Sequence, residues 1–203
     1  MRSGVQYRSF AHWFSYHWGW LLAAAALALL LVHGYLTRSR TPQPDYTVNW
    51  VGATALSEEE EAAISAALAR AGADQNGDGQ VTAAVNQYLI DFALTPDSAG
   101  YADSYAGLLK LTAQVQTGDC YLYLVEDPER FQSATGIFQY LDGTIPSDEE
   151  GYECANWERM CFLWQPEGLE HQGWLGRRAL FGGDEAQELF PGSDALFGAL
   201  AGR

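Results

Sequence analysis

One feature near the amino terminus constrains this chain more than any other: an apolar run over residues 18–36. The run contains no Asp, Glu, Lys or Arg, and His33 is its only strongly polar side chain. A segment of about 20 such residues matches the hydrocarbon thickness of a bilayer, and aromatic residues at both ends are typical of membrane interfaces. The run therefore predicts a transmembrane helix over residues 18–36, with membrane lipid as its first partner.

Two other interpretations of the run stay open. A helix buried in a protein core could be equally apolar, although it would seldom carry arginines and aromatic residues at both ends. A signal peptide could be cleaved after the small positions at Val32 and Gly34. The segment before the run is long and aromatic, and the run exceeds the usual apolar core of a signal peptide, so the sequence favours an uncleaved anchor.

The predicted anchor divides the chain into a tail of residues 1–17, a linker of residues 37–45 and a domain of residues 46–203. Arginines are balanced across the anchor, with Arg2 and Arg8 before it and Arg38 and Arg40 after it. Charge alone therefore does not set the orientation. An amino-terminal anchor with a short leading tail usually inserts as a signal anchor. We accordingly expect a cytoplasmic tail, a single pass through the cell membrane and an extracytoplasmic domain.

Composition limits the class of domain. The chain has 203 residues, a formal net charge of -15 and 48% hydrophobic residues, which fits one folded domain plus an anchor. All 26 acidic residues lie after residue 40, and an acidic domain argues against nucleic acid as a partner. Of the three cysteines, Cys120 is expected to be a buried thiol in an apolar strand, whereas Cys154 and Cys161 could pair.

Strand and helix patterns alternate after the linker. Residues 46–52 alternate in polarity, which predicts a strand with one apolar face formed by Tyr46, Val48 and Trp50. Ser57 and Glu60 have the spacing of a capping box, and apolar residues follow at helical intervals until Gly72. A second strand is predicted next, with an apolar face formed by Val81, Ala83 and Val85.

The rest of the chain continues this order. A helical stripe is predicted at Tyr101, Tyr105, Leu108, Leu109, Thr112 and Val115. Residues 120–125 have the continuous apolar character of a strand covered on both faces. Asp127 and Pro128 predict the start of another helix, with inward-facing Phe131, Ala134, Phe138 and Leu141. Two edge strands, around residues 160–164 and 173–180, and a helix from Ser193 complete the chain.

The β-α-β-α-β-α order predicts an α/β domain with a mainly parallel sheet, right-handed crossovers and helices on its faces. Short phrases within residues 46–142 resemble the first lobe of bacterial extracellular solute-binding proteins of ABC transporters. The matching positions are Gly118, Asp119, Phe131, Gly136, Phe138 and Leu141. The resemblance implies solute binding, but that family closes two lobes on its ligand, and residues 143–203 are too few for a second lobe. We therefore expect a shortened, single-lobe relative.

The segment DQNGDGQV, residues 74–81, places oxygen-bearing side chains at alternating positions. Calcium takes about six to eight oxygen ligands. The candidate ligands are the side chains of Asp74, Asn76 and Asp78, the carbonyl of Gln80, and Thr82 or a water beside it. The spacing resembles an EF-hand or dockerin loop, with Gly79 at the sharp turn. The predicted cofactor is calcium, which at extracellular millimolar levels would fill even a weak site.

The resemblance to an EF-hand is incomplete. The twelfth loop position is Val85, where those loops carry an acidic ligand, and a strand pattern follows in place of a second helix. A full site needs a carboxylate from elsewhere, for which Glu58, Glu59 and Asp91 are candidates. The alternative is a polar turn, because Asn-Gly and Asp-Gly pairs are strong turn formers. If an ion binds, its first role would be to brace the helix-to-strand connection.

The sequence contains no recognisable catalytic constellation. His171 is the single histidine after the anchor, and we expect it to be exposed. We predict no catalytic residues and a non-enzymatic binding or accessory module, with a small molecule, carbohydrate or protein as partner. Two alternatives are kept. One is a calcium-dependent carbohydrate-recognition or adhesion module, which requires exposed Trp157, Trp164 and Trp174; the other is a hydrolase that uses paired acidic residues.

Overall fold

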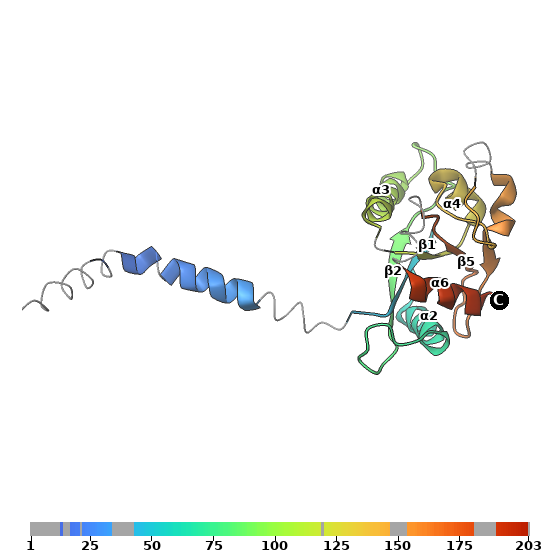
Figure 1. The fold of residues 1–203 in the computed structure, drawn as a ribbon. Helices are drawn as coiled ribbons and strands as arrows, with labels where there is room; N and C mark the ends of the chain where they lie inside the picture. Colours follow the sequence, from blue (N-terminus) through green and yellow to red (C-terminus); the bar gives the residue numbers. More distant parts are fainter. Residues whose placement is uncertain are drawn as a thin grey trace, which may run out of the picture. The chain divides into compact units, whose positions relative to one another are not determined.

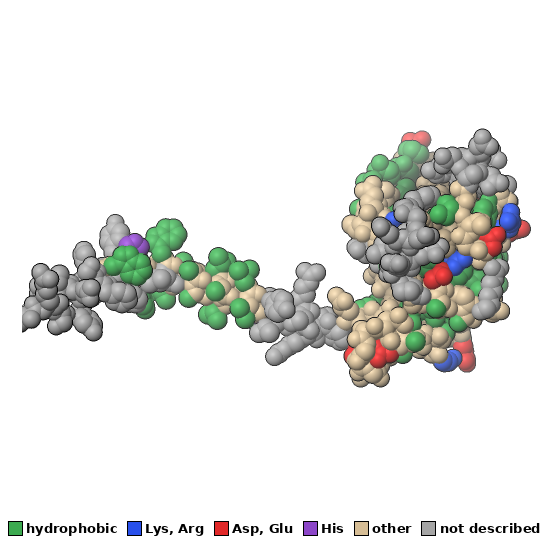
Figure 2. Space-filling view, in the orientation of Figure 1, with side chains coloured by type: hydrophobic (Ala, Val, Ile, Leu, Met, Phe, Trp, Pro, Cys, Tyr) green, Lys and Arg blue, Asp and Glu red, His purple; other side chains and the backbone are tan. Residues whose placement is uncertain are grey.

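The structure is a computed structural model of the chain, and it describes residues 13, 17–20, 22–33, 43–118, 120–146, 154–180 and 190–202. The chain divides into two compact units, Met1–Gln43 and Pro44–Arg203. The first unit contains helical residues over 17–20 and 22–33, with exposed hydrophobic side chains (Figures 1 and 2). The second unit is a sheet with helices on both faces.

The predicted transmembrane helix is not supported by the first unit. Among the described residues, no helix is both long enough and apolar enough to cross a membrane. Residues 21 and 34–36 of the predicted span lie outside the described part of the chain. The anchor over residues 18–36 therefore stays a proposal.

The second unit is built on one five-stranded mixed sheet with the order β2-β1-β3-β5-β4. Three strands are parallel: β1 (Tyr46–Gly52), β2 (Ala83–Leu89) and β3 (Leu122–Val125). Two further strands are antiparallel: β5 (Trp174–Arg177) beside β3, and β4 (Cys161–Leu163) at the edge. The prediction of an α/β domain with a parallel β1-β2-β3 core is confirmed, but the complete sheet is mixed. The prediction of two late edge strands is wrong for β5, which lies inside the sheet between β3 and β4.

Helices cover both faces of this sheet (Figure 1). They are α2 (Glu58–Ala71), α3 (Tyr101–Thr117), α4 (Pro128–Thr135) and α6 (Pro191–Leu200), with a short 3-10 helix, η1, at Cys154–Arg159. One buried cluster contains apolar side chains of α2 and α6, and the other contains those of α3 and α4. The β1-α2-β2 connection moves to one side of β1, and the β2-α3-β3 connection returns across it. Right-handed crossovers in opposite directions therefore place α2 and α3 on opposite faces.

Local sequence accounts for the start of α2. The Glu60 backbone N–H donates to Ser57 Oγ at 3.2 Å, and the Ser57 backbone N–H donates to Glu60 Oε2 at 2.9 Å. This is the predicted capping box, an arrangement that satisfies two N–H groups that the first helical turn leaves unpaired. At the other end, the Gly72 N–H donates to the Leu68 carbonyl at 2.9 Å.

The predicted strand faces are confirmed where the pattern is regular. Tyr46, Val48 and Trp50 of β1 belong to one buried cluster. Strand β3 is buried on both faces, with Leu122 and Leu124 in that cluster and Tyr123 and Val125 in the other. Successive side chains of a strand point to opposite faces of the sheet. The four residues of β3 therefore contribute to the hydrophobic core on both faces.

The predicted stripe of α3 is wrong in part. Leu111 is the buried residue of this helix, whereas Tyr105 and Leu109 are 49% and 53% exposed. Figure 2 shows hydrophobic side chains at the surface over α3. The cause is a close approach at Gly107, where an added Cβ would lie 2.6 Å from the Leu89 carbonyl oxygen. That contact turns Leu108 and Leu111 toward the core and leaves the adjacent stripe in solvent.

The predicted inner face of α4 is also only partly right. Phe131 is fully buried, but Ala134 is exposed. The helix ends at Gly136, whose φ of 63° is left-handed. Phe138 and Leu141 therefore lie beyond the helix, and Phe138 instead forms an isolated antiparallel bridge with Arg178.

The cysteines are free where they are described. Cys120 and Cys161 are buried thiols, and burial raises the pKa of each to about 12. The expectation for Cys120 is confirmed. Cys161 is not paired in this structure, and the side chain of Cys154 lies outside the described residues.

Candidate functional site

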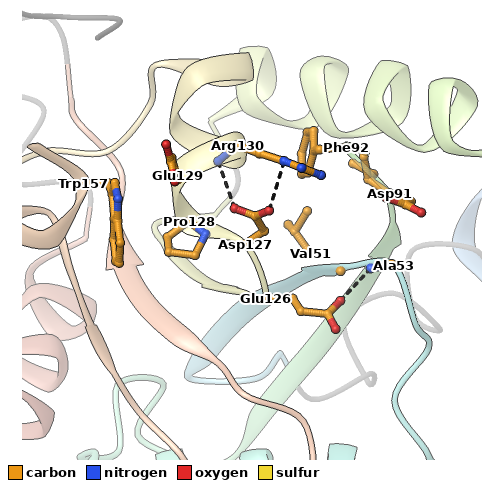
Figure 3. Close-up of a pocket in the computed structure, with 12 residues that line it drawn as sticks. Val51, Ala53, Asp91, Phe92, Glu126, Asp127, Pro128, Glu129, Arg130 and Trp157 are labelled. Atoms are coloured by element: carbon orange, nitrogen blue, oxygen red, sulfur yellow. Dashed lines mark hydrogen bonds and ion pairs between the residues drawn. The ribbon is translucent and has the colours of Figure 1, made fainter. Parts of the chain in front are cut away.

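A cavity of about 390 Å³ lies at the carboxyl ends of the three parallel strands (Figure 3). We call it the carboxyl-edge cavity. Its lining comes from the loops that follow β1, β2 and β3, from the start of α4 and from η1: Val51, Gly52, Ala53, Ile90, Asp91, Phe92, Glu126, Asp127, Pro128, Glu129, Arg130 and Trp157. The chain leaves β1 toward β2 and returns to β3 on the other side. Ligands of open α/β sheets bind at such a reversal of strand order.

Hydrogen bonds join the three strand ends that line the cavity. The Ile90 N–H donates to the Gly52 carbonyl at 2.8 Å, and the Glu126 N–H donates to the Val51 carbonyl at 3.0 Å. The Ala53 N–H donates to Glu126 Oε2 at 2.8 Å. These bonds hold the loops after β1, β2 and β3 in a common position.

Gly52 permits the approach of the Glu126 carboxylate. A Cβ added at residue 52 would lie 2.7 Å from Glu126 Oε2 and 2.9 Å from the Trp50 ring. A side chain at this position would therefore push the carboxylate away from the backbone N–H that it accepts from. The hydrogen bond between Glu126 and the Ala53 N–H therefore depends on the glycine at the end of β1.

The lining is predominantly acidic. Its ionisable side chains are four carboxylates and one guanidinium: Asp91, Glu126, Asp127, Glu129 and Arg130. Asp127 accepts from the Arg130 backbone N–H at 3.0 Å, which caps α4, and its other oxygen lies 3.5 Å from Arg130 Nε. Glu126 uses Oε2 alone, and its Oε1 has no hydrogen-bond partner among the described residues. One negatively charged oxygen is thus left available beside the cavity.

Two aromatic rings complete the walls. Figure 3 shows Trp157 and Phe92 on opposite sides of Asp127. Trp157 packs edge-on against Trp174 with 5.0 Å between ring centroids, and Phe92 packs edge-on against Phe131 at 6.3 Å. Each ring of the cavity wall is therefore packed against a second aromatic residue.

The predicted calcium loop lies elsewhere, between α2 and β2, and its acidic side chains are exposed (Figure 2). Its side-chain oxygens accept from the loop's own backbone: Asp74 from Gly77 at 2.7 Å and from Gly79 at 2.8 Å, Asn76 from Asp78 at 2.8 Å, and Asp78 from Gln80 at 2.8 Å. Gly77 and Gly79 have left-handed φ angles of 76° and 85°. Such bonds suffice for a polar turn, and each oxygen keeps a second lone pair for a cation.

Asp45 is a residue of this loop that sequence reasoning missed. Its Oδ1 accepts from the backbone N–H groups of Gln75 at 2.7 Å and Asn76 at 3.1 Å, and its Oδ2 accepts from the Thr82 N–H at 2.8 Å. Donation from Thr82 in particular lowers the pKa of Asp45. The parallel register pairs Tyr46 with Ala83, so the residue before β1 faces the residue before β2. The packed sheet sets that register, so no local sequence pattern identified Asp45 as a residue of the loop.

The carboxylates suggested as additional calcium ligands are badly placed. Glu58 and Glu59 begin α2, whereas the loop follows its end, about 21 Å away for 14 residues. Asp91 follows the carboxyl end of β2, whereas the loop precedes that strand. In the parts of the chain that the structure describes, no three His, Cys, Asp or Glu side chains are grouped to hold a metal.

The expectation that His171 is exposed is wrong. Its side chain is 25% exposed, and its Nδ1 lies 2.6 Å from Glu60 Oε1. The ring also packs edge-on against Trp50, with 5.8 Å between centroids. Burial alone would raise the pKa of Glu60, but donation from Ser57, His171 and Glu170 outweighs it and lowers the pKa to about 2.

The three carboxy-terminal tryptophans do not form one platform. Trp157 and Trp174 pack against the cluster that contains α3 and α4, and Trp164 packs against the cluster on the opposite face. All three are half-buried. They serve as core and as one wall of the carboxyl-edge cavity.

Comparison of the chain with family models, curated proteins and solved structures gives no match. The resemblance to solute-binding proteins therefore rests on the short phrases alone. Gly118 and Gly136 of those phrases end helices in left-handed conformations, with φ of 78° and 63°. Phe131 and Phe138 are fully buried, and Asp119 lies outside the described residues.

Proposed function

We propose that the unit Pro44–Arg203 is a non-enzymatic module that binds a small ligand in the carboxyl-edge cavity. The single observation that carries this proposal is the position of the cavity, at the reversal of strand order and at the carboxyl ends of β1, β2 and β3. Its volume of about 390 Å³ is in the usual range for small-molecule sites.

The proposal includes a tether and a location. Residues 18–36 would anchor the module in the cell membrane, as the uncharged run and its aromatic flanks indicate. The domain would lie outside the cytoplasm, because an amino-terminal anchor with a short leading tail usually inserts as a signal anchor. A single lobe that holds a ligand at its sheet edge resembles one half of a solute-binding protein. The chain would then act in binding, or as an accessory of a membrane system.

Calcium belongs to the proposal as a structural ion. Asp74, Asn76 and Asp78, with the Gln80 carbonyl and Thr82, would hold it between α2 and β2. The ion would brace that connection, and the residues of the loop lie at the opposite edge of the sheet from the cavity. We therefore propose that calcium does not affect ligand binding directly. It would act only by stabilising the fold.

The alternatives have less support among the described residues. A carbohydrate platform would need the three tryptophans on one surface, and they pack on two faces of the sheet. A paired-carboxylate hydrolase would need two buried acids close together. Glu60 is the one buried acid in the described part of the chain, and its two oxygens already accept bonds from Ser57, Glu170 and His171.

Nuclear magnetic resonance of the full-length, ¹⁵N-labelled protein in a mild detergent tests the site. A panel of amino acids, amines, carboxylic acids and sugars at millimolar concentration should shift the backbone signals of Gly52, Asp91 and Glu126. Ala53 is an exposed residue of the cavity wall. Ala53→Trp should abolish the shifts, because the larger side chain would occupy the space of the ligand.

Ala66→Trp is the matched control for that experiment. Ala66 is another exposed alanine, and it lines a separate hollow beside Trp164 and Arg70. The control should bind as the unmodified protein does. If no compound shifts the cavity signals, or if Ala66→Trp alone abolishes binding, the carboxyl-edge cavity is not the ligand site.

A further inference from the structure

We infer that the carboxyl-edge cavity takes a compact organic cation, such as an amine or a guanidinium compound. This inference rests on the proposed function of the same site. Three features carry it: the excess of carboxylates in the lining, the unpartnered oxygen of Glu126 and the two aromatic walls.

The charges of the lining oppose an anionic ligand. Four carboxylates and one guanidinium leave a formal charge of -3 around the cavity. A helix start can attract an anion through its free N–H groups, but α4 begins with Asp127, whose carboxylate already accepts from the Arg130 N–H. Arg130 is in turn paired with Asp127 at 3.5 Å. Both positive features of the cavity therefore lie beside the Asp127 carboxylate, whose negative charge opposes the binding of an anion.

The geometry opposes a bare metal ion. Asp91 follows β2, whereas the other three carboxylates lie between the end of β3 and the first turn of α4. In the described residues, no three such groups are close enough to share an ion. Metal sites of hard cations are lined by oxygen, whereas this cavity has an indole and a phenyl ring in its wall. A cavity of about 390 Å³ is also far larger than one ion requires.

The aromatic walls favour an organic cation. An ammonium or guanidinium group near an aromatic face gains attraction from the ring quadrupole, and the apolar part of the ligand buries surface against the same rings. Glu126 Oε1 can accept from the charged group while Oε2 keeps its bond to the Ala53 N–H. The ligand would thus be held by charge at Glu126 and by stacking at Trp157 or Phe92.

A matched set of three probes tests the charge class: benzylamine, benzyl alcohol and benzoate, titrated into the full-length protein in detergent. Benzylamine should bind with shifts at Gly52 and Glu126, and the other two should bind at least about tenfold more weakly. Glu126→Gln should weaken benzylamine binding by about tenfold, because it removes the charge and keeps the acceptor for the Ala53 N–H.

Arg130→Gln should have the opposite effect. It removes the positive charge of the lining and releases Asp127, so the affinity for benzylamine should rise. Asp91→Asn provides a second loss of negative charge if Glu126→Gln does not fold. Stronger binding of benzoate or benzyl alcohol at the same signals would overturn the cation inference and leave the binding site standing. No binding of any probe at these signals would count against both.

Discussion

At the scale of single residues, Glu60 joins parts of the chain that are far apart in sequence. Its Oε2 completes the cap of α2 with Ser57, and its Oε1 accepts from the Glu170 N–H at 3.1 Å and contacts His171 Nδ1. The residue is 5% exposed, so these donors replace the water that a carboxylate would otherwise bind. The loop between β4 and β5 is thereby fixed to the start of α2.

Glu60→Gln should lower the free energy of unfolding by about 1–3 kcal/mol, because charged hydrogen bonds are lost in a buried place. Urea unfolding at pH 7 measures the change. Glu59→Gln is the matched control, since Glu59 is exposed in the same helical turn, and it should change stability by less than about 0.5 kcal/mol. Equal effects of the two substitutions would show that Glu60 does not hold the loop.

The contribution of Glu60 should depend on pH. Its pKa falls from an ordinary 4.5 to about 2 in the folded state. The unfolded chain therefore binds the proton first as pH falls, and the stabilisation present above pH 4.5 is lost between 4.5 and 2. The difference in unfolding free energy between the protein and Glu60→Gln should shrink when measured at pH 3. A difference that stays constant from pH 7 to pH 3 would contradict the lowered pKa.

At the scale of elements, replacing each of two helical glycines by alanine is expected to have opposite effects on stability. Replacing glycine by alanine inside a helix gains about 1 kcal/mol of propensity. At Gly198 of α6 an added Cβ meets nothing within 4 Å, whereas at Gly107 of α3 it would lie 2.6 Å from the Leu89 carbonyl oxygen. The carbonyl belongs to the end of β2 and cannot easily move, so overpacking at this contact outweighs propensity.

We expect Gly198→Ala to raise the free energy of unfolding by about 0.5–1 kcal/mol and Gly107→Ala to lower it by about 1 kcal/mol or more. Parallel urea titrations of the two variants decide the signs. A stabilising Gly107→Ala would mean that α3 does not approach β2 as closely as the structure shows.

The loop between α2 and β2 allows a test of calcium. A ligand that binds only the folded state stabilises it by mass action, so millimolar calcium should raise the melting temperature in a concentration-dependent way. Replacing both Asp74 and Asp78 by Ala should abolish this increment, and magnesium should substitute poorly, because it demands a stricter octahedral shell. Absence of both a thermal shift and binding heat would make the loop a polar turn.

Substitution of Asp45 tests the structural role of the loop independently of calcium binding. Asp45→Ala removes an acceptor for three backbone N–H groups, so it should lower the melting temperature even in the presence of a chelator. Asp97→Ala, in the exposed loop before α3, is the control and should leave the melting temperature unchanged. If the two variants have the same melting temperature, the hydrogen bonds of Asp45 do not stabilise the fold.

At the scale of the whole molecule, the two units carry different charges. The acidic residues all follow residue 40, and the uncharged run precedes it. If residues 18–36 anchor the chain with the domain outside, protease added to intact cells should remove the domain, and alkaline carbonate should leave the chain in the membrane fraction. A domain protected from protease would contradict the proposed orientation. Extraction of the chain by carbonate would contradict the proposed membrane anchor.

Sequence alone was sufficient for features that depend on neighbours in the chain. The capping box at Ser57 and Glu60, the faces of β1 and β3 and the order of strands and helices follow from spacings within a few residues. Such spacings set the local hydrogen bonds and the side of each element that is apolar. These features could be predicted because no distant contact competes with them.

Tertiary structure decided the features that join distant segments. The buried face of α3 depends on the approach of Gly107 to β2, and the Glu60 contact with His171 spans 111 residues. The carboxyl-edge cavity exists because β3 returns beside β1, which places Glu126 next to Gly52 and Ala53. Strand order and register select these contacts, and many registers are compatible with the same local pattern. Only the packed sheet distinguishes among them.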